Sequence, residues 1–171
     1  RTIIDGGGKS RCADLSGYDV IGRPDYIRPL ESTNTVLAGF TVCNGYTYEK
    51  LTGAGDGAGV RGGTVVACVI SGNTVYQGNG GGCYDSVLRE SLIVGNRIEG
   101  PTIIPDGAAA LACLLYNCTV VSNTASMDKP EYRDMMSYGI CGGWAFNCIV
   151  QDNRSASGVE LNVRGSWLLS T

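Results

Sequence analysis

Short runs in which apolar and polar residues alternate recur along this chain, and each run closes on an asparagine. Four copies align with one another, at residues 59–73, 82–96, 109–123 and 139–153, and a looser copy covers 35–44. The closing asparagines are separated by 23 (73 to 96), 27 (96 to 123) and 30 (123 to 153) residues. A constant motif joined by connections of variable length is typical of a protein built from stacked repeats.

The copies predict strands rather than helices. Each copy centres on a short β-branched run with period-two alternation, bounded by glycine and asparagine. No window carries an apolar period of 3.6 residues long enough for a helix. The pattern therefore predicts an all-β fold, a right-handed parallel β-helix of about five to six coils with two to three short strands per coil. Residues 1–171 are expected to form one domain that belongs to a longer chain.

Stacking the copies aligns three columns of side chains. Two columns are expected on the same inward strand face, two residues apart. One inward column is Val42, Ile70, Ile93, Val120 and Val150. The other is Phe40, Cys68, Ser91, Cys118 and Cys148. The closing asparagines at 73, 96, 123 and 153 form the third column, at the turn, where asparagine tolerates a left-handed backbone and stacked amides can hydrogen-bond to one another.

The repeat has a characteristic order: a glycine pair, an apolar pair, cysteine, Ile or Val two residues later, and the closing asparagine. Together with the segments 2–8 (TIIDGGG) and 36–42 (VLAGFTV), it resembles the β-helix repeats of bacterial surface proteins. These include pectate-lyase-like repeat proteins, autotransporter passengers and chlamydial polymorphic membrane proteins. The resemblance implies an extracellular or cell-surface location. It implies little about activity, because that fold carries lyases, hydrolases, adhesins and passive stalks.

Composition and charge remove several classes of function. The net charge of −3 and the pI near 4.9 argue against a nucleic-acid partner. No apolar run approaches the ~18 residues of a membrane span. The chain has no histidine, which excludes Ser-His-Asp and Cys-His catalysis and every metal site that needs histidine. No Cys-x-x-Cys pair occurs either, so neither a metal nor a cofactor is expected.

Eight cysteines allow two interpretations, a disulfide framework or a ladder of buried thiols. Stacked neighbours keep their Cβ atoms about 4.8 Å apart, whereas a disulfide prefers about 3.8 Å. The sequence therefore predicts reduced, buried thiols at Cys68, Cys118 and Cys148. Cys113 replaces a corner glycine and Cys141 follows an inward position in the next coil, so this pair is the better candidate for a bridge.

The linkers between copies, residues 45–58, 74–81, 97–109 and 124–138, all leave after the asparagine turn and are expected to line one side of the fold. Tyrosine rings combined with scattered carboxylates suit sugars, which offer an apolar face together with hydroxyl groups. The candidate ligand-binding tyrosines are Tyr46, Tyr48, Tyr76 and Tyr132. The candidate carboxylates are Asp56, Asp85 and Asp106, which would drive glycoside hydrolysis only if two of them converged in a groove.

The expected function is a non-catalytic surface module: an adhesin, a stalk or a segment that binds polysaccharide or a host or cell-surface glycan. Two alternatives stay open. One is a polysaccharide lyase or glycoside hydrolase of the pectate-lyase-like fold. The other is a filament subunit that associates end to end through exposed strand edges. No catalytic residue is assigned, because the repeats supply no histidine to act as a tuned base.

Overall fold

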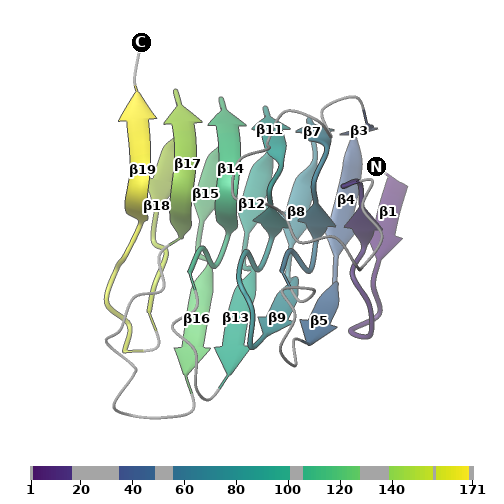
Figure 1. Ribbon diagram of the computed structural model, residues 1–171, viewed down its shortest axis with the longest axis horizontal. Helices are drawn as coiled ribbons and strands as arrows, with labels where there is room; N and C mark the ends of the chain where they lie inside the picture. Colours follow the sequence, from purple (N-terminus) through teal and green to yellow (C-terminus); the bar gives the residue numbers. More distant parts are fainter. Residues whose placement is uncertain are drawn as a thin grey trace.

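A computed structural model of the chain describes residues 2–16, 35–48, 56–100, 106–127, 139–155 and 157–169. These residues form strands and no helix, and all strand pairs between named strands are parallel. Figure 1 shows the strands side by side along the long axis of the molecule, with the two ends of the chain at opposite ends of that axis. The fold is therefore all-β and parallel, as predicted.

The strands belong to three sheets. Sheet A contains, in spatial order, β1 (Thr2–Asp5), β4 (Phe40–Cys43), β8 (Val69–Ser71), β12 (Leu92–Val94), β15 (Thr119–Val121) and β18 (Ile149–Gln151). Sheet B contains β2 (Ala13–Asp14), β6 (Val60–Arg61), β10 (Cys83–Tyr84), β14 (Ala110–Tyr116), β11 (Val87–Arg89), β7 (Thr64–Val66) and β3 (Val36–Ala38), with β17 (Ile140–Phe146) and β19 (Val163–Leu169) added beyond β14. Sheet C contains β16 (Thr124–Met127), β13 (Arg97–Gly100), β9 (Thr74–Tyr76) and β5 (Tyr46–Tyr48). The chain passes through sheets B, A and C in that order, and one such passage is called a repeat below.

The predicted apolar column is confirmed in sheet A. Its members are direct partners in the register of neighbouring strands: Val42 with Ile70, Ile70 with Ile93, Ile93 with Val120, and Val120 with Val150. The first four are fully buried and Val150 is half-buried. One side chain from each repeat therefore contributes to a continuous core.

The asparagine column forms a buried hydrogen-bonded ladder. Each side-chain Nδ2 donates to the Oδ1 of the asparagine in the next repeat at 2.8 to 3.0 Å, from Asn73 through Asn96, Asn123 and Asn153 to Asn162. Each backbone N–H donates to the same Oδ1 at 2.9 to 3.2 Å. In the first repeat Gly45 takes the position and donates its N–H to Asn73 Oδ1 at 2.8 Å. A Cβ on Gly45 would collide with the carbonyl of Ala58, so this place requires glycine.

The left-handed backbone expected at these asparagines belongs instead to the residue before each of them. The conformation recurs at three fixed corners of every repeat, with φ between +50° and +78°. The corner from sheet B to sheet A has Gly39, Ala67, Glu90, Asn117 and Asn147. The corner from sheet A to sheet C has Asn44, Gly72, Gly95, Ser122 and Asp152. The corner within sheet B has Gly62, Asp85, Ala112, Gly142 and Gly165. Glycine adopts this conformation without steric penalty, which explains part of its high share in the chain.

The cysteine column is buried at Cys68 and Cys118, which are 1% and 2% exposed, as predicted. Cys148 differs, because it is only half-buried near the end of the molecule. All eight cysteines are free thiols.

The segments expected to be linkers after each asparagine are in part strands. Each one begins with a strand of sheet C, which buries one side chain per repeat, Val75, Ile98 and Ala125 among them. The sequence does show alternation of outward and inward residues in these strands, at 46–48, 74–76, 97–99 and 124–126. Runs of three residues are too short to predict a strand from their own pattern.

Replacing Ile93 with alanine is expected to lower the free energy of unfolding by roughly 2–5 kcal/mol, because a fully buried aliphatic side chain leaves a cavity. Ile149→Ala is the matched control, since Ile149 lies on the outward side of the same sheet and is 58% exposed. Urea denaturation of both variants measures the difference. Equal losses of stability would contradict the inward column.

Replacing Asn96 with alanine is expected to lower the free energy of unfolding by about 3 kcal/mol or more. The substitution deprives two donors on Asn73, the carbonyl of Ile70 and one lone pair of Asn123 Oδ1 of their partner in a fully buried site. Asn147→Gly removes an exposed side-chain hydrogen bond to Asn117 and keeps a residue suited to the left-handed backbone, so it is expected to lower the free energy of unfolding by no more than about 1 kcal/mol. A urea denaturation curve for Asn96→Ala that matches the one for Asn147→Gly would show that the ladder adds little.

Candidate functional site

Three of the four predicted tyrosines lie together on the outward face of sheet C. Strand alternation turns Thr47, Val75, Ile98 and Ala125 to the inner side and leaves two outward columns. One outward column is Tyr46, Thr74, Arg97 and Thr124. The other is Tyr48, Tyr76, Glu99 and Ser126. These residues make up what we call the tyrosine face. The fourth candidate, Tyr132, lies outside the described residues.

Tyr48 and Tyr76 are direct register partners in β5 and β9, and their rings stack with centroids 5.4 Å apart and planes 18° from parallel. β5 is the end strand of sheet C (Figure 1). Tyr48 is 51% exposed and Tyr76 is half-buried. The stack therefore presents aromatic surface to solvent, held on strands rather than on loops.

Charged groups lie beside the two rings. Arg97 and Glu99 form an ion pair at 3.1 Å on β13, the strand next to β9. Glu99 is the register partner of Tyr76. An apolar ring surface bordered by one hydrogen-bond donor and one acceptor group suits a ligand that carries both apolar and hydroxyl surfaces. Arg97 and Glu99 were missed in the sequence because they fell in an expected linker.

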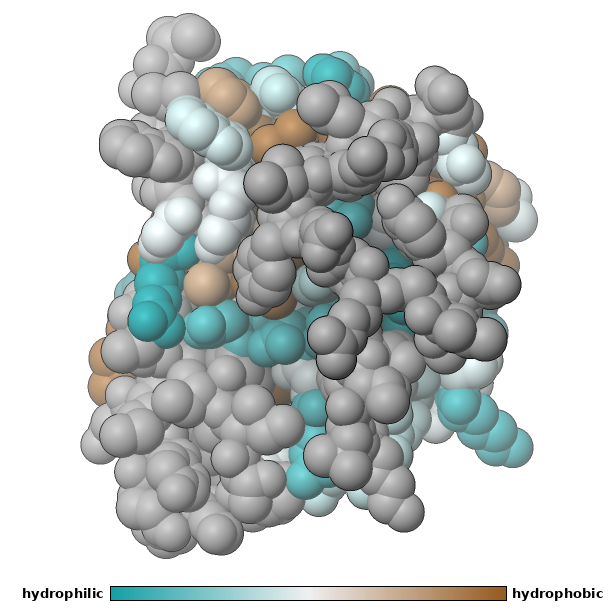
Figure 2. Space-filling model, viewed as in Figure 1, coloured by the Kyte–Doolittle hydropathy of each residue, from teal (hydrophilic) through white to brown (hydrophobic). Residues whose placement is uncertain are grey.

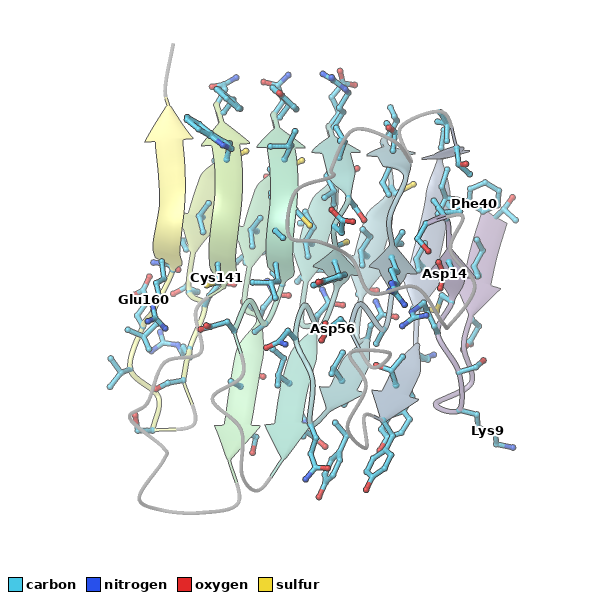
Figure 3. The ribbon with its side chains drawn as sticks, in the orientation of Figure 1. Lys9, Asp14, Phe40, Asp56, Cys141 and Glu160 are labelled. Carbon is cyan, nitrogen blue, oxygen red and sulfur yellow. The ribbon has the colours of Figure 1, made fainter. Side chains whose placement is uncertain are left out.

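Two of the predicted carboxylates, Asp56 and Asp106, lie elsewhere, in segments through which the chain passes from sheet C to sheet B. Figure 2 shows hydrophilic residues across the middle of the face in view. Figure 3 labels Asp56 near the middle of the view, with Asp14 toward the N-terminal end of the molecule and Cys141 and Glu160 toward the C-terminal end. Asp56 is only 6% exposed, and its Oδ1 accepts the backbone N–H of Asn79 at 2.6 Å. Its carbonyl accepts a hydrogen bond from the Arg11 guanidinium at 2.7 Å. Asp56 therefore holds neighbouring segments together.

Asp106 continues the same small ladder one repeat further. Asn79 Oδ1 accepts the backbone N–H of Asp106 at 3.0 Å, just as Asp56 accepts that of Asn79. Asp106 Oδ2 lies 3.5 Å from the Arg164 guanidinium, and its buried Oδ1 has no hydrogen-bond partner among the described residues. Burial raises the pKa of Asp106, while Arg164 and the Cys141 thiol lower it in part.

Among the described left-handed residues at the corner within sheet B, Asp85 is the one carboxylate, and the others are glycine or alanine. It adopts φ of +51° and is half-buried. Burial raises the pKa of Asp85 to about 6, and the nearby Arg61 opposes this shift.

Asp56 and Asp106 do not form a catalytic pair by their placement. Asp56 and Asp106 occupy the same position two repeats apart, which corresponds to about 10 Å at the usual strand spacing. Glycosidase carboxylates work at separations of about 5 to 9.5 Å. Asp56 also accepts a backbone N–H, and Asp106 lies beside Arg164. Of the three predicted carboxylates, Asp85 is therefore the best candidate for a general acid or base.

An aromatic strip on the outward side of sheet B was not predicted. Tyr116 and Phe146 are register partners whose rings stack at 4.9 Å, and Arg89 of the preceding strand lies 4.4 Å above the Tyr116 ring. Trp144 lies beside Phe146 at 6.1 Å and is 41% exposed. The signal was available, since residues 89, 116 and 146 each precede the cysteine column by two positions.

The disulfide candidates Cys113 and Cys141 are not register partners. Cys113 lies opposite Gly143 and is fully buried, whereas Cys141 lies opposite Leu111 and is half-buried. Both thiols are free, and each has its own hydrogen bond, Cys113 to the Leu111 carbonyl and Cys141 to Asp106. The bridge stays a prediction, and nothing in the register brings the two sulfur atoms together.

The chain matches no protein-family model, no curated protein and no solved structure. Within the described residues, no group of three or more cysteines and carboxylates is placed to hold a metal ion. The same residues contain no helix long and apolar enough to cross a membrane.

Replacing Asp85 with asparagine is expected to raise the free energy of unfolding at pH 7.5 by roughly 1 kcal/mol, allowing for solvent screening of a half-exposed group. The carboxyl has a pKa of about 6 when folded and an ordinary pKa near 4 when unfolded. Ionisation is therefore opposed in the folded state, and wild-type stability falls as pH rises from about 4 to 7.

Asparagine tolerates the left-handed backbone as aspartate does, so the substitution tests charge rather than conformation. Urea denaturation of both proteins between pH 4 and pH 8 measures the effect. The stability gap should close below about pH 4. A gap that does not change with pH would contradict the burial of this carboxyl.

Proposed function

We propose that this chain is a non-catalytic carbohydrate-binding module that uses the tyrosine face of sheet C. The observation that supports it most is the stacked, solvent-exposed pair Tyr48 and Tyr76, with the ion pair of Arg97 and Glu99 on the adjoining strand. Sugar rings pack their C–H faces on aromatic rings while their hydroxyls reach neighbouring polar groups. The ligand class is a polysaccharide or a cell-surface glycan.

The proposed architecture is a right-handed parallel β-helix of about five to six coils. It is supported by three parallel sheets that the chain visits in a constant order and by the continuous asparagine ladder. An extracellular or cell-surface location, as in the bacterial repeat proteins that the motif resembles, goes with this proposal. Extended sheet faces of this kind give a rigid base for repeated, modest contacts.

The alternative is a polysaccharide lyase or glycoside hydrolase, and Asp85 favours it. A half-buried carboxyl whose pKa is raised to about 6 has the property expected of a general acid or base near neutral pH. Against this alternative, Asp56 is engaged with a backbone N–H and Asp106 lies beside Arg164. Both of the other predicted carboxylates are thus engaged in structural contacts.

The test is a glycan array followed by calorimetric titration of the strongest soluble oligosaccharide. The double variant Tyr48→Ala/Tyr76→Ala is expected to weaken binding at least tenfold, about 1.4 kcal/mol, because it removes the stacking surface. Tyr48→Phe/Tyr76→Phe keeps both rings and is expected to bind within a few-fold of wild type, which separates stacking from hydroxyl contacts.

Trp144→Ala serves as the matched control, since Trp144 is an exposed aromatic residue on a different sheet. Loss of binding in Trp144→Ala but not in the double tyrosine variant would move the site to the aromatic strip. Release of sugars from any polysaccharide, abolished by Asp85→Asn, would establish the enzymatic alternative instead.

A further inference from the structure

Two thiols meet at the corner between sheets B and A. Thr119 and Ile149 are register partners, so Cys118 and Cys148, each one residue earlier, are direct neighbours in adjacent repeats. The backbone N–H of Cys118 donates to Cys148 Sγ at 3.4 Å. Cys68 is the matched comparison in the same column, because its neighbours are Phe40 and Ser91 and no thiol lies beside it there.

The position suits a bond between repeats. Neighbouring Cα atoms in a parallel ladder lie about 4.8 Å apart, inside the range of about 4.4 to 6.8 Å found for disulfides. The Cβ atoms must still approach by about 1 Å. Both cysteines lie between strands, directly after the left-handed corner residues Asn117 and Asn147, where a small shift does not break a strand ladder.

The two thiols differ in access and in chemistry. Cys118 is 2% exposed, whereas Cys148 is half-buried and reachable from solvent. Hydrogen bonding with Cys118, whose backbone N–H donates to Cys148 Sγ, lowers the pKa of Cys148 because it stabilises the thiolate, and burial opposes this shift. Cys148 is therefore the thiol that attacks first.

We propose that Cys118 and Cys148 form a dithiol site that closes to a disulfide by exchange with a small oxidised disulfide such as oxidised glutathione. The Cys148 thiolate attacks one glutathione sulfur, a mixed disulfide forms, and one glutathione leaves as a thiolate that takes up a proton. The Cys118 thiolate then attacks Cys148 Sγ and expels the second glutathione. Two protein thiols are oxidised and one glutathione disulfide is reduced to two thiols.

The site is separate from the tyrosine face, so it does not depend on the proposed function. The bond would join two repeats across the segment 119–147, which contains residues 128–138 with the charged sequence DKPEYRD. Closing a loop of this length restricts the unfolded chain, and the unfolding midpoint is expected to rise by roughly 10 °C.

The test is incubation of the reduced full chain with excess oxidised glutathione, followed by alkylation of free thiols and peptide mass spectrometry. The expected result is six alkylated cysteines of the eight, a peptide linked through Cys118 and Cys148, and two reduced glutathiones released per chain. The mapping uses the unmodified chain, so it decides the question even where a variant fails to fold.

Variants separate the two steps. Cys118→Ser is expected to stop at a mixed disulfide on Cys148, Cys148→Ser is expected to leave Cys118 free, and Cys68→Ser is expected to keep the bond. The raised midpoint should return to its reduced value on adding dithiothreitol. Eight alkylated cysteines after oxidation would overturn the proposal, and so would a bond between Cys113 and Cys141 with Cys118 and Cys148 both alkylated.

Discussion

A buried primary amide needs two acceptors for its N–H groups and donors for its oxygen, and in this protein the preceding and the following repeat together supply them. Each asparagine of the ladder uses Nδ2 for the next amide and for a carbonyl, while its Oδ1 receives the previous amide and backbone N–H. An unmet buried polar group costs about 1 to 3 kcal/mol. The distances stay at 2.8 to 3.0 Å although the connecting segments differ in length, so the ladder rather than the connections sets the height of each repeat.

A fixed height and register place equivalent side chains next to each other. A slip by one residue would turn Ile70 and Ile93 to solvent and leave the amides unpaired, so both effects favour the same alignment. The outward positions obey the same rule, which is why rings stack at Tyr48 and Tyr76 and again at Tyr116 and Phe146. Such pairs add about 0.5 to 1.5 kcal/mol each and also form continuous surface patches. On this scaffold, stability and the proposed ligand-binding surface arise from the same columns.

The corners explain where the chain uses unusual residues. Every repeat turns through left-handed residues at constant positions, and glycine occupies many of them. Where another residue appears, it brings a side chain to a corner that is otherwise bare, as Asp85 does between Gly62 and Ala112. Other polar side chains near the corners act as scaffold: Asp56 and Asn79 each accept a backbone N–H of the following repeat. A series of polar side chains is thus not by itself a catalytic site, because several of them hydrogen-bond to the backbone of the next repeat.

The sequence by itself determined the strand class, the alignment of the repeats, the inward apolar column and the closing asparagines, because those depend on periodicity and on equal offsets within each copy. It also identified Tyr46, Tyr48 and Tyr76, whose side chains the fold brings to one face. Only the tertiary structure decided that residues after each asparagine form a third sheet, that Arg97 and Glu99 join the tyrosines, and that Cys113 lies opposite Gly143 rather than Cys141. The reason is physical: strands of three residues have too few internal contacts to be recognised alone, and their stability and neighbours come from repeats more than twenty residues away in the chain.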